Sequence, residues 1–217
     1  WPLRRFPLLL DGACQVVEAT IIIEHLDLHH PGPVRLIPED REAALEARFL
    51  DRLFDNYVHT PMQKIVLDAM RGPGEHDPHG VQDARDLLER TYGWLERHLD
   101  GRDWAAAGGF GLADCAAAPA LFYADWVHPI GDAFPAVRAY RDRLNARPSF
   151  ARAACHRASP PRLDPPPQSP GGGIAAHEAE QRQHRTGRQE RAPDTLDQPL
   201  CAPIAAPHHQ PRIRPQH

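Results

Sequence analysis

The order of hydrophobic and polar positions predicts two short strands and a helix at the start of the chain. An apolar run at 8–10 is followed by Asp11-Gly12, a dipeptide that favours a tight hairpin turn. Residues 14–17 have the pattern of the returning strand. Apolar residues then recur at helical spacing from 19 to 26, and the Pro-Gly-Pro at 31–33 breaks that pattern. We therefore expect a strand–hairpin–strand–helix unit over residues 1–30.

From residue 38 onward the period is that of amphipathic helices. Pro38 with acids at 39, 40 and 42 predicts a helix start, because proline is tolerated in the first turn and acids favour that end of the helix dipole. We expect Pro61 to kink or end this helix before a helical pattern resumes up to residue 70. The expected apolar stripe comprises Leu45, Phe49, Leu50, Leu53, Phe54, Tyr57 and Val58.

Three further helices are predicted after a polar loop over 72–80. Apolar residues at three- and four-residue steps indicate a helix over 81–99. Residues 112–127 are Ala-rich and apolar on almost every side, which is typical of a buried central helix. A last amphipathic helix spans 135–146, with Val137, Tyr140 and Leu144 on its inner side. The expected fold class is mainly α, a small ββα unit followed by an all-α bundle.

The composition changes sharply near residue 155. No Phe, Trp or Tyr follows Phe150, whereas 12 of the 24 prolines lie between 160 and 215. Such a segment buries too little apolar surface to offset its conformational entropy. We expect the folded part to end near Ala154, and residues 155–217 to form a disordered Pro-rich tail.

Charge and composition exclude several classes of partner. The chain has 217 residues, and its 25 basic residues against 29 acidic ones give a net charge of -4, so nothing indicates a nucleic-acid surface. Its longest apolar runs are far shorter than the roughly 20 residues that span a bilayer, so no membrane partner is expected. The four cysteines form no CxxC pair, which argues against a structural zinc site and makes a reducing cytoplasm the default location.

The string Phe6-Pro7-Leu8-Leu9-Leu10-Asp11-Gly12 resembles the third strand of the thioredoxin-like half of cytosolic glutathione S-transferases, here of bacterial type. In that family, the residue before a cis-proline offers its backbone to the cysteinyl part of glutathione, which pairs like an added strand. The resemblance assigns this role to Phe6 and Pro7.

The segment from Val17 to Leu26 resembles the family's Glu-Ser-x-x-Ile-x-x-Tyr-Leu string, in which Glu and Ser at a helix start hold the γ-glutamyl group of glutathione. Glu18 matches the Glu, and its carboxylate suits an ammonium group. Ala19 replaces the Ser, which removes a hydrogen bond worth roughly 0.5–1.5 kcal/mol. The resemblance thus implies a glutathione site formed by Phe6, Pro7, Glu18 and Ala19.

Two strings in the helical part also resemble the family. Residues 110–121 match its Phe-Ser-x-Ala-Asp segment, a capping box in which Asp114 bonds back to the cap residue, here Gly111. We expect glycine at the cap to cost only a few tenths of a kcal/mol relative to serine. Residues 141–150 match the closing Arg-Leu-x-x-Arg-Pro segment. The resemblance therefore divides the chain into a truncated thioredoxin-like unit, 1–30, and an all-α domain, 31–154.

The resemblance implies a protein that uses glutathione with a small apolar electrophile beside the long helix, where Arg52 and Tyr57 are candidates to line the pocket. It also implies a homodimer, without a metal. The family's activating Tyr, Ser or Cys precedes the residues matched here, so we assign no catalytic residue and expect an N-terminally truncated chain with impaired conjugation. The alternative is a noncatalytic module for protein association.

Three other candidate sites have simpler interpretations. His25 and His29 have metal-ligand spacing on a helix, but no HExxH motif or carboxylate partner is evident in the sequence, which favours solvated helix residues. The Gly-Gly-Phe-Gly string at 108–111 lacks the Lys and Ser/Thr of a phosphate loop and is expected to be a turn before a helix. Cys115 is expected to be a small core residue.

Overall fold

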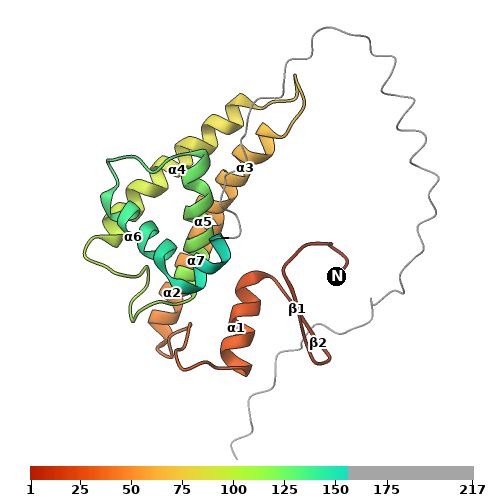
Figure 1. Ribbon diagram of the computed structural model, residues 1–217, viewed down its shortest axis with the longest axis vertical. Coiled ribbons are helices and arrows are strands. Elements are labelled where there is room, and N and C mark those ends of the chain that lie inside the picture. Colours follow the sequence, from red (N-terminus) through yellow and green to blue (C-terminus); the bar gives the residue numbers. More distant parts are fainter. Residues whose placement is uncertain (156–217) are drawn as a thin grey trace, which may run out of the picture.

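The computed structural model describes residues 1–155 and has a ββα unit beside a bundle of helices (Figure 1). The mainly α class expected from the sequence is confirmed. The predicted disordered tail lies outside the described residues, except for Cys155 at the end of the last helix. In chain order the elements are β1 (Leu8–Asp11), β2 (Cys14–Val17), α1 (Ala19–His29), α2 (Arg41–Leu53), η1 (Phe54–His59), α3 (Thr60–Ala69), α4 (Pro78–Leu99), α5 (Leu112–Val127), α6 (Pro135–Ala146) and α7 (Pro148–Cys155).

The two strands form an antiparallel hairpin with Gly12 in the left-handed region at its turn, φ 61°. Leu8 pairs with Val17, Leu9 with Val16, and Asp11 with Cys14. Because side chains alternate across a sheet, Leu9 and the buried Val16 share one face, and Leu8 and Leu10 lie exposed on the other. The hairpin and helix expected over residues 1–30 are confirmed in position.

The long helix runs through Pro61 instead of ending there. The residues before it, 54–59, form a π-helical turn, and α3 begins at Thr60 with Pro61 in its first turn. Proline has no N–H to donate and its ring crowds the carbonyl four residues earlier, so a widened turn accommodates it without breaking the helix. The hydroxyl of Thr60 donates to the carbonyl of Asp55 at 2.9 Å inside this turn.

Helix α5 is the centre of the bundle, as its composition predicts. It packs against α2, η1, α3 and α6, as shown in Figure 1. Leu112 and Leu121 on it are fully buried. Small alanines dominate its surface, which lets the surrounding helices approach closely. The largest fully buried side chains around it include Leu50, Phe54, Val58, Leu88, Tyr92, Leu95, Val137, Tyr140 and Leu144.

Three details of the helices differ from the sequence expectation. Helix α4 begins at Pro78 and not at 81, because Asp77 accepts a hydrogen bond from the Gly80 N–H at 2.9 Å and caps the helix before the apolar pattern starts. Helix α7 was not predicted. The expected stripe on α2 is also too broad: Leu45, Phe49 and Tyr57 are half or more exposed, whereas its other members are buried.

None of the helices within residues 1–155 combines the length and the hydrophobicity required to cross a bilayer.

Candidate functional site

The four residues expected to hold glutathione flank the open end of the hairpin. The last pair of the ladder is Leu8 with Val17, so Pro7 directly precedes β1 at its open end and Glu18 directly follows β2 there, with Phe6 and Ala19 next to them in the chain. All four residues are exposed, and the Phe6 side chain is 93% exposed. The Phe6–Pro7 peptide bond is cis, as the resemblance implies. The four expected residues are thus exposed and flank the open end of the hairpin.

Glu18 has an unusual backbone conformation at the start of α1. Its φ of 71° lies in the left-handed region, which residues with a side chain rarely adopt. Such a conformation costs on the order of 1–3 kcal/mol and is concentrated at ligand sites. The Ile22 N–H donates to the Glu18 carbonyl at 2.9 Å, which is the first bond of the helix. The amides between them have no partner within the helix and suit a bound carboxylate.

Arg52 takes part in a polar cluster that joins α1 to α2. The hydroxyl of Thr20 lies 3.0 Å from both carboxylate oxygens of Asp51, which is only 3% exposed. The Arg52 guanidinium donates to Thr20 at 2.8 Å, to Asp51 at 2.8 Å and to Asp55 at 2.6 Å. Neither Arg52 nor Tyr57 lines either of the two hollows described below. No sequence pattern links Thr20 with Asp51, because they lie 31 positions apart in the chain.

Gly111 and Asp114 form the expected cap at the start of α5. One Asp114 oxygen accepts from the Gly111 N–H at 2.8 Å, and the other accepts from the Ala105 N–H at 2.9 Å and the Tyr140 hydroxyl at 2.5 Å. Asp114 is completely buried. Burial and the neighbouring Asp114 carboxylate raise the pKa of Tyr140 well above its usual value, so this hydroxyl stays protonated and donates. The network is structural.

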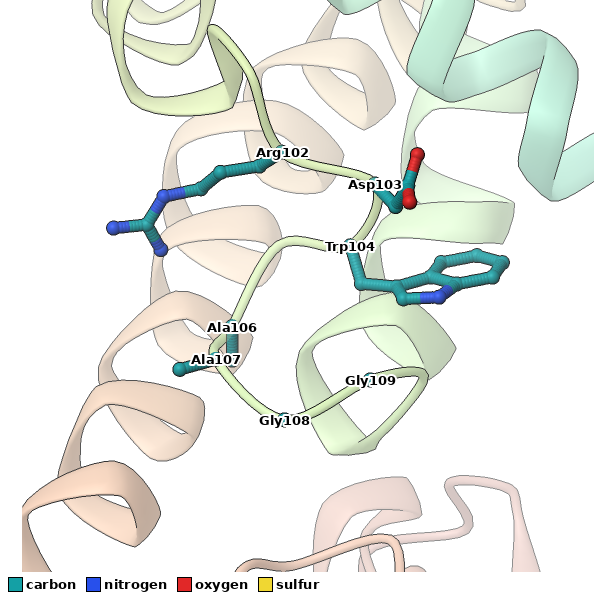
Figure 2. A pocket seen from close by; sticks show the side chains of 7 residues that line it. All are labelled: Arg102, Asp103, Trp104, Ala106, Ala107, Gly108 and Gly109. Atoms are coloured by element: carbon teal, nitrogen blue, oxygen red, sulfur yellow. The ribbon is translucent and has the colours of Figure 1, made fainter.

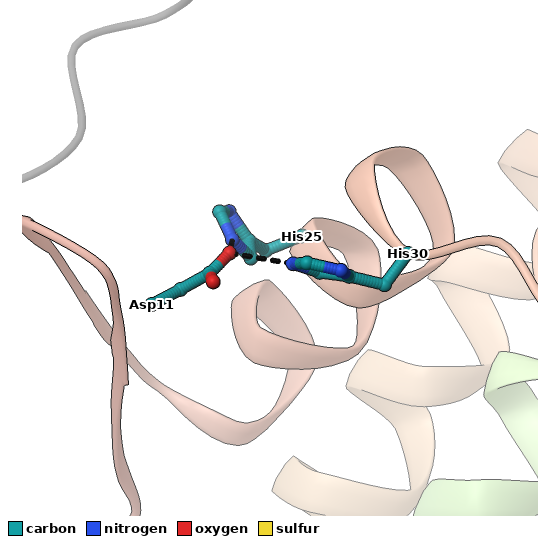
Figure 3. Close-up of side chains that lie close together, drawn as sticks. All are labelled: Asp11, His25 and His30. Carbon is teal, nitrogen blue, oxygen red and sulfur yellow. Dashed lines mark hydrogen bonds and ion pairs between the residues drawn. The ribbon is translucent and has the colours of Figure 1, made fainter.

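The opposite end of the hairpin holds a cluster that the sequence analysis missed (Figure 3). The Asp11 carboxylate lies 2.7 Å from Nε2 of His25 and 2.7 Å from Nε2 of His30. The expectation that His25 lacks a carboxylate partner is therefore wrong, since the hairpin returns Asp11 against α1. These two hydrogen bonds lower the pKa of Asp11, and the bond from His25 has the larger effect.

The glycine-rich stretch before α5 has no chemistry of its own. A shallow hollow of about 380 Å³ follows residues 102–109, and Figure 2 shows the Arg102 and Trp104 side chains turned to opposite sides of this loop. Arg102 bonds Glu46 at 3.0 Å, and Trp104 packs edge-on against Phe110. The loop leads into the α5 cap, as expected.

Cys115 is a poor candidate nucleophile. Burial raises the pKa of its thiol to about 11, so the thiolate is scarce at neutral pH. The interpretation of Cys115 as a small packing residue is consistent with its place on α5.

Comparison with known proteins gives a consistent family. The model of the glutathione S-transferase C-terminal domain matches residues 77–143. A glutathione S-transferase from Methylobacterium radiotolerans, crystallised in complex with glutathione sulfonate, superposes with a TM-score of 0.61 at 31% identity, covering 70% of this chain and 72% of that one.

Two relatives with curated names match most of the described region. FtsZ-localized protein A of Caulobacter vibrioides is 32% identical over 147 residues, which cover 62% of this chain and 61% of that protein. The chain thus spans less than two thirds of that relative's length. A probable maleylacetoacetate isomerase of Vibrio cholerae is 26% identical over 157 residues, covering 70% of this chain and 72% of the isomerase.

The cap of α5, the ββα unit and the bundle around α5 agree with these matches, and the chain belongs to the glutathione S-transferase family.

Proposed function

We propose that the chain binds glutathione at the open end of the hairpin and uses its thiol with a small apolar electrophile beside α2. The observation that carries this proposal is the left-handed Glu18 at the exposed start of α1, directly after the Leu8–Val17 pair that Pro7 precedes. An unfavourable backbone conformation at an exposed position is typical of a residue held for a ligand.

The parts of glutathione find complementary groups at this end of the hairpin. By the family resemblance, the Phe6 backbone pairs with the cysteinyl residue, as an added strand would. The Glu18 carboxylate suits the γ-glutamyl ammonium, and the amides of Ala19 and Thr20 suit its carboxylate. The Methylobacterium relative, crystallised with glutathione sulfonate, supports this ligand class. The electrophile then lies toward Arg52 and Tyr57, and the working form is a homodimer.

Isothermal titration of the full chain with reduced glutathione tests the proposal. Glu18→Gln removes the charge that faces the ammonium group, so we expect about 10- to 100-fold weaker binding, the equivalent of one charge-assisted hydrogen bond. Glu39→Gln makes the same change at an exposed residue outside the site and is the matched control. Phe6→Ala should also bind normally, because only the backbone of Phe6 is used.

Equal binding by wild type and Glu18→Gln would contradict the placement of the site, and no binding by wild type would contradict the function.

The second candidate function is a noncatalytic module for protein association. The observation that favours it is the 32% identity to a protein named for its localisation with FtsZ. Size-exclusion chromatography with light scattering, run beside the titration, separates the two. If the chain does not bind glutathione but forms a stable dimer or partner complex, it has the second function.

A further inference from the structure

The turn end of the hairpin brings three metal-ligating side chains to one point (Figure 3). Asp11 comes from the end of β1, His25 from the middle of α1, and His30 from the residue that ends α1. One ligand atom from each lies within 4.8 Å of the other two. In the part of the chain that the structure describes, no other group of three such side chains converges in this way.

The fold, and not the helical period, selects His30. His29 is four residues after His25 and its ring lies 4.5 Å from the His25 ring, yet it is not part of the cluster. His30 has left the helix, with φ −129°, while its N–H still donates to the Leu26 carbonyl at 2.8 Å. This change of direction at the end of α1 brings the His30 ring to Asp11.

The three side chains combine one anchored ligand with two that can adjust. The His25 side chain is 10% exposed, and those of Asp11 and His30 are 33% and 54% exposed. Zinc bonds of about 2.0–2.2 Å in a tetrahedral site separate ligand atoms by roughly 3.4 Å. Both nitrogens now lie 2.7 Å from the same Asp11 oxygen, so binding requires each to withdraw by about 0.7 Å. Rotation of the half-buried Asp11 side chain and the exposed His30 side chain can provide this.

The donor set defines the class of ion. Two imidazole nitrogens and one carboxylate oxygen suit zinc and neighbouring divalent transition metals, whereas calcium and magnesium prefer oxygen alone. All three side chains also line a hollow of about 880 Å³ between the hairpin, α1, the loop before α2 and Arg48 on α2, which gives an ion a path from solvent.

We propose that Asp11, His25 and His30 bind one divalent transition-metal ion of the zinc class, with a fourth position open to water on the side of this hollow. The ion connects the hairpin turn to both the middle and the end of α1, and so stabilises the ββα unit. The site lies at the opposite end of the hairpin from Pro7 and Glu18. The proposal is therefore independent of glutathione binding and can fail or succeed separately.

The test uses the full chain after treatment with a chelator. Zn²⁺ is titrated by calorimetry, thermal unfolding is followed with and without Zn²⁺, and the visible absorption of bound Co²⁺ reports the ligand field. We expect one equivalent of Zn²⁺ to bind at a site that raises the melting temperature, because an ion that binds only the folded state stabilises it.

Matched variants identify the ligands. Asp11→Asn and His30→Gln should each abolish the binding of one equivalent of Zn²⁺ and the zinc-dependent rise in melting temperature. His29→Ala, which changes the neighbouring histidine, should leave the zinc binding and the rise unchanged. The chain has 14 histidines, several of them beyond residue 155. A variant combining His208→Ala with His209→Ala is therefore a second control, in which the zinc binding and the rise in melting temperature should also be unchanged. Circular dichroism without metal checks that each variant folds.

Three results would overturn the proposal. They are the absence of a zinc-dependent shift in the wild type, an unchanged shift and Co²⁺ spectrum in both Asp11→Asn and His30→Gln, and loss of the signal only when His208 and His209 are replaced.

Discussion

At the scale of single residues, the close approach of the Leu36 backbone explains why position 111 is a glycine. Its φ of −151° is extended, a conformation that any residue adopts. An added Cβ, however, would lie 2.7 Å from the Leu36 carbonyl oxygen. The same oxygen accepts a hydrogen bond from the Leu112 N–H at 2.9 Å, so it cannot move away without weakening that bond. In this chain, the crowding by Leu36 therefore favours glycine over the serine of the family's pattern.

Gly111→Ser should lower the free energy of unfolding by about 1–3 kcal/mol, because the new atoms have to push the Leu36 segment away from α5. Urea denaturation followed by circular dichroism measures the change. Gly131→Ser is the control, since nothing lies within 4 Å of a Cβ at that position, and should change stability by less than about 0.5 kcal/mol. Equal stability of the two variants would show that the Leu36 loop yields freely.

At the scale of elements, the corner between α3 and α4 depends on two carboxylates. Asp68 accepts a hydrogen bond from the Asp77 N–H at 2.7 Å, and this bond is the main reason why its pKa lies below the usual value. The Lys64 ammonium, 2.5 Å from Asp77, and then the Gly80 N–H lower the pKa of Asp77. Both carboxyls are thus stabilised in their charged form, and Asp77 caps α4 in that form.

These pKa shifts predict an acid-sensitive corner. Each carboxyl has a lower pKa folded than unfolded, so its contribution is complete above the ordinary carboxyl pKa of about 3.9 and is lost as the pH falls through the folded value. We expect these two groups to make stability fall below about pH 4, and to fall less steeply in a variant combining Asp68→Asn with Asp77→Asn. Asparagine still caps helices well.

Chemical denaturation between neutral and acid pH measures this dependence. Asp83→Asn, at an exposed position on α4, is the control and should leave the slope unchanged. The same slope in the double variant and in wild type would contradict the prediction.

At the scale of the whole molecule, a few polar contacts hold the ββα unit on the bundle. Thr20 bonds the buried Asp51, while Arg48 donates to both oxygens of Glu24 at 2.9 and 3.0 Å across an exposed pair. Exposed ion pairs are each worth at most about 1 kcal/mol, whereas losing one hydrogen bond to a buried carboxylate costs about 1.5–3 kcal/mol. The contact between Thr20 and Asp51 should therefore dominate the docking of the two parts.

Thr20→Val tests this view, because it leaves the Asp51 carboxylate with one partner fewer. We expect faster hydrogen exchange in residues 8–29 and unchanged exchange in α4 and α5, measured by mass spectrometry. Arg48→Ala breaks the exposed pair instead and should have a smaller effect. An effect of Arg48→Ala equal to that of Thr20→Val would contradict the assignment.

Both the fold and the proposed glutathione site are largely local in the sequence, and this is why they could be predicted. The strands at 8–11 and 14–17 and the helices at 112–127 and 135–146 depend on periods of two and about 3.6 residues. Phe6, Pro7, Glu18 and Ala19 fall within two short strings joined by a tight turn, so their proximity follows from the register of a hairpin.

What the sequence by itself determined is the order of the elements, the central place of α5, and the α5 cap with Asp114 beside Gly111, because each depends on neighbours along the chain. Only the tertiary structure decided which distant groups meet: Asp11 with His25 and His30, Thr20 with Asp51, and the Leu36 carbonyl with Gly111. These contacts depend on how the hairpin folds back on α1 and how the loop before α2 reaches α5. Packing of the complete chain fixes both, and no periodic pattern encodes them.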